Sequence, residues 1–283
     1  MAKPGRREQE RSKCCTSDLN SPADVSLDWP LILTYHHVDA SAHSRYVMRA
    51  DAFERQLTRM LDRGFSAITL QEALATGPFG DRSARPGSFT VTFDDALASF
   101  GDLAFPVLER LGLLGQTTVF VPTRWVGADN GWRESPTLLQ RLVPWNEVPE
   151  LIMSWERIAE VARAGVSIQS HGHGHLPLNK LPYAEVLADV TTSLTLLARH
   201  GIHARYFALP YGWHSPEAKR AIKDAGLDAA FSVKWGGHDR FEIRRIPIYG
   251  TDSALTTRLK LSGRYFDVFD AAAALAGKRK YRR

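Results

Sequence analysis

Phe89-Thr90-Val91-Thr92-Phe93-Asp94-Asp95 is the stretch of sequence that decides the fold, because an alternating strand pattern ends there in two carboxylates. Alternation of apolar and polar residues is typical of a β-strand. Other short β-rich segments lie on both sides of it, and helical patterns separate them. Strands that alternate with helices predict parallel βα units and an α/β fold.

About seven βα units are expected along the chain. The strand patterns cover 31–35, 67–70, 89–93, 117–121, 166–169, 205–209, 230–233 and 243–248. The helical patterns cover 52–63, 71–75, 105–111, 155–164, 184–199 and 216–225. This count favours one closed or nearly closed barrel. The alternative, an open doubly wound sheet, should bring a glycine-rich phosphate loop, and neither GxGxxG after the first strand nor GxxxxGK[ST] occurs.

The bulk composition describes a globular chain with one principal domain. It has 283 residues, of which 44% are hydrophobic and 24% charged, and no run approaches the roughly 20 apolar residues of a membrane span. We expect a polar leader at 1–28, a domain at 29–270 and a basic tail at 271–283. The leader has no apolar core typical of a secretion signal, which predicts a cytoplasmic location. Its two cysteines, Cys14 and Cys15, are too few for a disulfide framework.

The net charge of +5 is concentrated at the two ends of the chain. Residues 1–13 carry five Lys/Arg against two Glu, and residues 278–283 carry five more Lys/Arg. Nucleic-acid binding would call for basic residues across the folded body, so no nucleic-acid partner is expected. The sequence leaves the oligomeric state open.

Ser170-His171-Gly172-His173-Gly174-His175 follows another predicted strand and places two histidines four residues apart. Carboxyl ends of parallel strands meet at one rim, so His171 and His175 should lie near Asp95. Two imidazoles and a carboxylate are three of the four ligands of a hydrolytic zinc site, with the fourth left to water. Asp94 is then available as a general base. Taken singly, the aspartates would also suit a helix N-cap and the histidines a polar surface.

These motifs resemble those of the polysaccharide deacetylase family, the NodB-homology domain of carbohydrate esterase family 4. Residues 92–95 match its first motif, with Ala96 in place of the following Gly. Residues 170–175 match its second motif, and 207–212 resemble its third. The opening segment 33–38 is similar to that of the exopolysaccharide-associated branch, and the likeness extends over residues 30–250.

The resemblance implies a distorted (β/α)₇ barrel and a metal-dependent hydrolase that removes N-acetyl groups, or O-acetyl groups, from a carbohydrate. Metal-bound water would attack the acetyl carbonyl with Asp94 as general base. The metal would be Zn²⁺, or Co²⁺, Ni²⁺ or Mn²⁺ in its place. Its ligands would be Asp95, His171 and His175. Tyr211 would stabilise the oxyanion through its backbone N–H, with Pro210 and Trp213 beside the substrate.

Two departures from the family pattern bear on catalysis. The arginine of the third motif, which holds the base aspartate, corresponds to Ala208, so Asp94 lacks that cation. The fifth motif, which supplies the general acid, has no match after residue 238. His36 is the candidate replacement, because it ends the first strand, the expected neighbour of the last. His37 and His214 are the alternatives.

The substrate is less constrained than the metal site. Several tryptophans, whose faces commonly stack on sugar rings, are expected in or near rim loops: Trp125, Trp132, Trp145, Trp213 and Trp235. The first alternative function is a same-fold amidohydrolase, either a sugar deformylase or a cyclic ureide hydrolase. The second is a non-catalytic carbohydrate-binding descendant.

Overall fold

The computed structural model describes residues 30–41, 44–76, 87–130, 150–233, 236–237 and 239–275. The strands are β1 (Leu31–Tyr35), β2 (His37–Asp39), β3 (Val47–Arg49), β4 (Ser66–Ala67), β5 (Ser88–Phe93), β6 (Thr117–Val121), β7 (Ser167–Ser170), β8 (Tyr206–Ala208), β9 (Ala229–Ser232), β10 (Ile243–Arg244) and β11 (Ile246–Pro247). The α-helices are α1 (Ala50–Asp62), α2 (Leu70–Ala75), α3 (Phe105–Arg110), α4 (Trp155–Arg163), α5 (Tyr183–Arg199), α6 (Pro216–Asp224), α7 (Ala254–Leu261) and α8 (Tyr265–Leu275). Residues 1–29 and 276–283 lie outside the described ranges, so the expected leader, tail and cytoplasmic location stay predictions.

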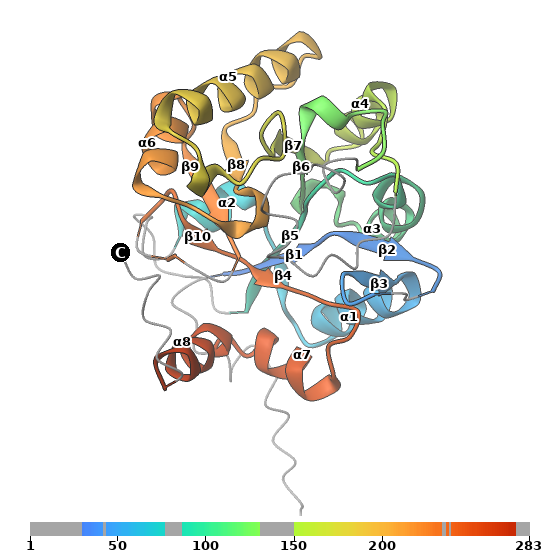
Figure 1. Cartoon of the computed structure of the whole chain (residues 1–283). Coiled ribbons are helices and arrows are strands. Elements are labelled where there is room, and N and C mark those ends of the chain that lie inside the picture. The colour runs from blue at the N-terminus through green and yellow to red at the C-terminus, as the bar shows by residue number, and fades with distance from the viewer. Residues whose placement is uncertain are drawn as a thin grey trace, which may run out of the picture.

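One sheet forms the centre of the molecule, and helices surround it (Figure 1). Its strand order is β10-β9-β8-β7-β6-β5-β1-β11, with β4 beside β5, and every pairing in it is parallel. The two ends of this order, β10 and β11, are consecutive in the chain and are separated only by Arg245. The sheet therefore nearly closes, which confirms the predicted barrel.

The predicted single strand over 243–248 is wrong, because the chain changes neighbours at Arg245. Before that residue β10 pairs with β9, and after it β11 pairs with β1 at the opposite end of the strand order. The segment thus bridges the gap in the barrel. The Arg245 side chain at the crossing is completely buried.

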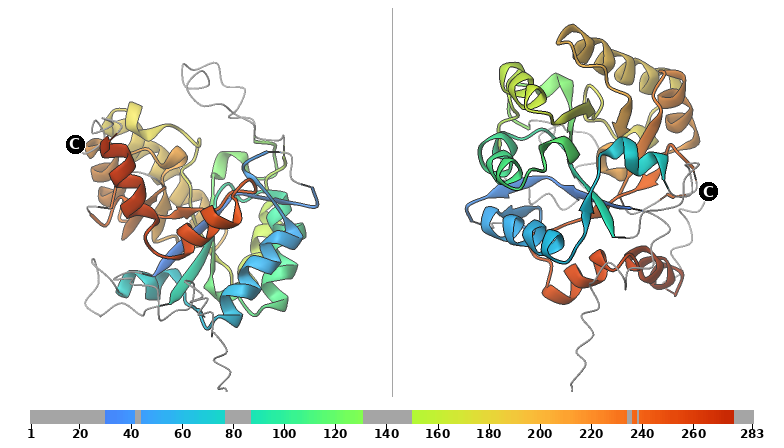
Figure 2. Two further views of the ribbon diagram at one scale, coloured as in Figure 1. Left: turned by 90° about the horizontal axis from the view of Figure 1, so that it is seen from below. Right: turned by 180° about the vertical axis from the view of Figure 1, so that it is seen from behind.

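Three apolar clusters hold the barrel together. One includes Phe53 of α1 and Ile158 of α4, and a second joins α5 and α6 through residues such as Val190 and Ile222. The third cluster joins alternate residues of several strands to Leu70 of α2. Figure 2 shows α2 in front of the strands in the view from behind. Because all the strands of the central sheet are parallel, their carboxyl ends lie together at one end of the barrel. The candidate site lies at that end.

β5 is buried on both faces, although its alternating pattern is more typical of a half-exposed strand. The threonine side chains satisfy their hydroxyls on neighbouring backbone: Thr90 donates to the Gln116 carbonyl at 3.0 Å and Thr92 to the Leu33 carbonyl at 2.8 Å. A buried hydroxyl is costly only when it lacks a partner. The alternation of apolar and polar residues in β5 therefore does not separate a buried face from an exposed one. Both faces are buried, and the threonines of one face are hydrogen-bonded.

Local sequence explains where several helices begin and end. The side chains of Thr69, Ser154, Ser215 and Ser253 each accept a backbone N–H of the first turn of α2, α4, α6 and α7. Gly165, just after α4, has φ of 106°, a conformation that favours glycine. Helices α7 and α8 were not predicted. None of the described helices is both long and apolar enough to cross a membrane.

Candidate active site

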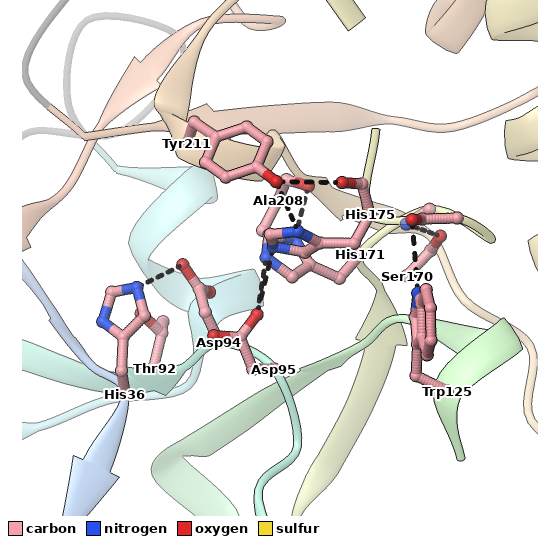
Figure 3. A network of polar contacts seen from close by, with 12 residues as sticks. His36, Thr92, Asp94, Asp95, Trp125, Ser170, His171, His175, Ala208 and Tyr211 are labelled. Carbon is pink, nitrogen blue, oxygen red and sulfur yellow. Dashed lines mark hydrogen bonds and ion pairs between the residues drawn. The ribbon is translucent and has the colours of Figure 1, made fainter. Parts of the chain in front are cut away.

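The predicted site residues meet at the carboxyl end of the barrel, on segments that follow four different strands (Figure 3). His36 follows β1, Asp94 and Asp95 follow β5, His171 and His175 follow β7, and Tyr211 follows β8. Asp95, His175 and Tyr211 have φ between 55° and 70°, which L-residues rarely adopt. Strained backbone of this kind persists where the surrounding structure imposes it, and it clusters at functional sites.

Asp95, His171 and His175 form a buried cluster whose ligand atoms lie within 4.8 Å of one another. Asp95 Oδ1 lies 3.4 Å from His171 Nε2 and 3.2 Å from His175 Nε2. This oxygen is fully buried and has no hydrogen-bond partner. A buried carboxylate oxygen without a partner costs free energy, and a cation placed between the three groups would remove that cost. The donor set therefore fits a divalent metal ion.

The outer nitrogens of both histidines are already occupied. His171 Nδ1 lies 2.8 Å from the Ala208 carbonyl, an acceptor, so Nδ1 carries a proton and Nε2 is the atom that faces Asp95. His175 Nδ1 lies 3.2 Å from the Tyr211 hydroxyl. Both rings are thereby oriented with Nε2 towards Asp95, as metal-ligating histidines require.

A carboxylate from α5 holds the histidine loop, and sequence reasoning missed it. Asp189 accepts the backbone N–H of His173 at 2.9 Å and of Gly174 at 2.7 Å. A Cβ at Gly172 would lie 2.7 Å from Asp189 Oδ2, and its φ is 79°. Glycine is therefore required where the loop turns over the carboxylate. The sequence did contain a signal for Asp189: it is an acidic residue on the inner face of a helical pattern, 14 residues after His175.

Two further side chains contact the histidine loop. His173 Nδ1 lies 3.1 Å from the Thr123 hydroxyl, and the His173 side chain is half-buried. Trp125, expected in or near a rim loop, lies just after β6 and donates from its indole N–H to the Gly174 carbonyl at 3.2 Å. Both side chains therefore brace the loop that carries His171 and His175.

Asp94 has a charge partner after all, and that partner is Arg245. The guanidinium donates to both carboxylate oxygens, Nη1 to Oδ1 and Nη2 to Oδ2, each at 2.7 Å. It donates also to the Thr92 hydroxyl at 3.2 Å. A two-pronged arginine–carboxylate pair is strong and fixes geometry. Position 208 is an alanine and supplies no cation. Arg245, which lies between β10 and β11, provides the positive charge beside Asp94 instead.

The pKa values of the two aspartates and of His175 are shifted by burial and by neighbouring charges. Burial raises the pKa of Asp94, but the charges of Arg245 and His171 outweigh it and hold that pKa below its ordinary value. Burial likewise opposes ionisation of Asp95, while the two adjacent imidazoles bring its pKa well below the usual range. Burial lowers the pKa of His175, which favours its neutral form. Both carboxylates are therefore ionised at neutral pH.

The three candidate general acids have different neighbours. His36 Nε2 lies 3.8 Å from Asp94 Oδ2, and 23% of its side chain is exposed. His37 turns to Glu150, with Nδ1 2.8 Å from Oε2. His214 lies beside Glu242, with Nδ1 3.4 Å from Oε2. Of the three, His36 combines contact with Asp94 and access from outside.

The proposed substrate residues of the third motif form a turn beside the histidines. Pro210, Tyr211 and Gly212 make a short 3₁₀ turn, and the Tyr211 ring lies 4.8 Å from the His175 ring between centroids. Trp213 is half-buried, with its ring 5.2 Å from that of Tyr211. Trp132, Trp145 and Trp235 lie outside the described residues.

Comparison with known proteins identifies a family that matches the chain. The sequence profile of the polysaccharide deacetylase family matches residues 81–230, just over half of the chain. YxkH from Bacillus subtilis (strain 168), whose name places it among polysaccharide deacetylases, is 24% identical over 211 residues. That match covers 74% of this chain and 66% of YxkH, so the chain spans just under two thirds of that relative.

Solved structures share the fold. IcaB from Ammonifex degensii is 25% identical with a TM-score of 0.67, and the match covers 83% of this chain and 98% of IcaB. The deacetylase PplD from Streptococcus pyogenes, solved in complex with acetate, is 18% identical with a TM-score of 0.64. That match covers 82% of this chain and 97% of PplD.

Proposed function

The chain belongs to the polysaccharide deacetylase family, and from this premise we propose that it hydrolyses N-acetyl groups of a carbohydrate with the aid of a divalent metal ion. The predicted family is confirmed by the family match. The activity, the metal, the roles of individual residues and the substrate are the proposal. The observation that carries it is the buried Oδ1 of Asp95, which has no hydrogen-bond partner and lies within 3.4 Å of the Nε2 atoms of His171 and His175.

Asp95, His171 and His175 would hold the ion. Bound there, it would supply Lewis-acid activation of a water molecule and of the acetyl carbonyl. The mixed oxygen and nitrogen donor set suits Zn²⁺, with Co²⁺, Ni²⁺ or Mn²⁺ as substitutes.

Asp94 would accept the proton of the attacking water. Arg245 keeps this carboxylate ionised and fixes its plane, so the base needs no reorientation before it acts.

His36 would donate a proton to the leaving amine. Its Nε2 lies 3.8 Å from Asp94 Oδ2, and its partly exposed side chain can be reached from outside, as a group that transfers a proton must be. The backbone N–H of Tyr211 would stabilise the oxyanion of the tetrahedral intermediate. Pro210 and Trp213, in the same turn, would lie against the sugar.

The substrate class rests on the relatives. YxkH is named as a polysaccharide deacetylase, and PplD was solved with acetate, the product of deacetylation. Both departures that made a non-catalytic descendant worth considering, Ala208 and the absent fifth motif, have spatial substitutes in Arg245 and His36. These substitutes favour a working enzyme.

The proposal is tested by metal analysis of the purified protein together with acetate release from matched N-acetylated and O-acetylated oligosaccharides. We expect a stoichiometric metal, release from N-acetyl substrates, and loss of both on treatment with a chelator. Release of formate from N-formyl sugars without release of acetate would indicate a deformylase. Bound metal with no turnover of any acylated sugar would indicate a binding protein.

A further inference from the structure

A cleft of about 450 Å³ runs between α1 and α7, apart from the site described above. The two helices lie side by side in the view from below (Figure 2, left). The ring of Tyr249 lines the cleft, and Tyr46 packs against it with centroids 5.6 Å apart. Tyr46 in turn lies 5.9 Å from the His36 ring. A pair of tyrosines therefore stands between the cleft and the candidate active site.

Positive charge dominates the lining of the cleft, which contains five arginines and one acidic residue. The arginines are Arg49, Arg55, Arg59, Arg63 and Arg258. The acidic residue, Asp252, already accepts from the ammonium of Lys260 at 2.6 Å. Three of the arginines follow one another at four-residue spacing along α1 and its end, an arrangement of like charges that destabilises a helix.

Carboxylates compensate only part of this charge. Arg49 and Arg55 share the single carboxylate of Asp51, at 2.9 Å and 2.7 Å. Among the described residues, the guanidinium groups of Arg59 and Arg258 have no carboxylate within 4 Å. They approach the cleft from two different helices. A ligand that bridged them would bring α1 and α7 together and relieve the repulsion along α1.

The floor of the cleft is apolar. Met60, Phe65 and Leu261 line it and are buried. A cleft of this volume, with an apolar floor and a few converging polar groups, is typical of sites for small organic ligands. An anion in such a place is screened less by water than one on an open surface.

We propose that this cleft binds a phosphate group attached to an organic group, with Arg59 and Arg258 as the principal phosphate ligands. A guanidinium presents paired N–H donors that match phosphate oxygens, which explains arginine rather than lysine at both positions. The organic group would lie on the floor formed by Met60, Phe65 and Leu261. A soluble phosphate ester and the headgroup of an anionic lipid share this chemistry.

Binding of phenyl phosphate, measured by calorimetry, tests the cleft with a soluble ester. The test variant is the double substitution Arg59→Gln/Arg258→Gln. The control is Arg163→Gln/Arg199→Gln, which removes two exposed arginines from the last turns of α4 and α5. We expect affinity to fall about tenfold for each cleft arginine removed and to be unchanged in the control. Arg59→Lys/Arg258→Lys keeps the charge without the paired donors, so we expect an intermediate affinity.

Sedimentation with phosphatidylcholine vesicles, with and without phosphatidic acid, identifies a lipid source. If the lipid headgroup is the ligand, the protein sediments only with the phosphatidic acid vesicles, and the cleft variant does not. The inference is overturned if the wild type binds neither probe, or if the cleft and control variants bind equally well. Because both cleft arginines are accessible and the control has the same net charge, unchanged thermal unfolding of the two variants excludes misfolding as the cause. We expect metal content and deacetylation to be unchanged in both variants, so the test is independent of the proposed activity.

Discussion

Asp94 and Asp95 are consecutive residues at the end of one strand, yet they lie in opposite electrostatic environments. Asp94 has both oxygens bonded to a fixed cation of the chain, Arg245. Asp95 faces two imidazoles, and its buried Oδ1 has no hydrogen-bond partner. The difference teaches how one dipeptide provides two functions: the carboxylate that is already neutralised suits a base, and the one that is not suits a metal ligand.

The largest effect is expected from substituting each of these two aspartates separately. Asp95→Ala should remove both metal and activity, because a ligand is lost. Asp94→Asn should keep the metal and lower kcat by about 10²–10⁴-fold, because only the base is lost. Metal analysis and acetate release on the same samples separate the two outcomes. Full activity in Asp94→Asn would contradict the assignment of the base.

His36→Gln should lower kcat by a similar or smaller factor, within about 10²–10⁴-fold, and leave the metal content unchanged. His37→Gln and His214→Gln are the matched controls, because these side chains bond to Glu150 and Glu242. A larger loss of kcat in either control than in His36→Gln would move the general acid to that residue.

Arg245 tests whether the fixed cation defines the role of Asp94. Arg245→Ala leaves a buried carboxylate uncompensated and should lower the free energy of unfolding by about 3–5 kcal/mol. Activity should fall about 10²-fold, as expected when a catalytic group loses its position. Arg245→Met combined with Asp94→Asn removes both charges and should recover much of the stability in thermal unfolding. Equal destabilisation in the single and double variants would show that the two charges do not interact.

The smallest effect is expected from the support of the metal-binding loop. Asp189→Asn should weaken metal affinity by about 10- to 100-fold, because the carboxylate that accepts two loop N–H groups becomes a neutral amide. Glu185→Gln, an exposed change on the same helix, is the control. Competition with a chelator measures the affinity, and equal values for the two variants would limit Asp189 to a structural role.

Prediction from the sequence succeeded where the information was local. The bounds of β1 and β6 were predicted residue for residue, and α2 was predicted to within one residue, because apolar runs and caps lie within each segment. The strand at 243–248 failed because its split depends on which edges of the sheet it joins. Arg245 carried a local signal, because it is one of two adjacent arginines within an apolar segment, but its partner Asp94 lies 151 residues away.

The sequence by itself determined the barrel class, the family and the grouping of Asp95, His171 and His175, because parallel strands deliver their carboxyl ends to one rim. Only the tertiary structure decided what surrounds those residues. Closure of the barrel brings Arg245 and His36 to Asp94, and helix α5 brings Asp189 to the histidine loop. Charge partners of buried groups are chosen by proximity in space, and proximity between distant segments is a property of packing rather than of pattern.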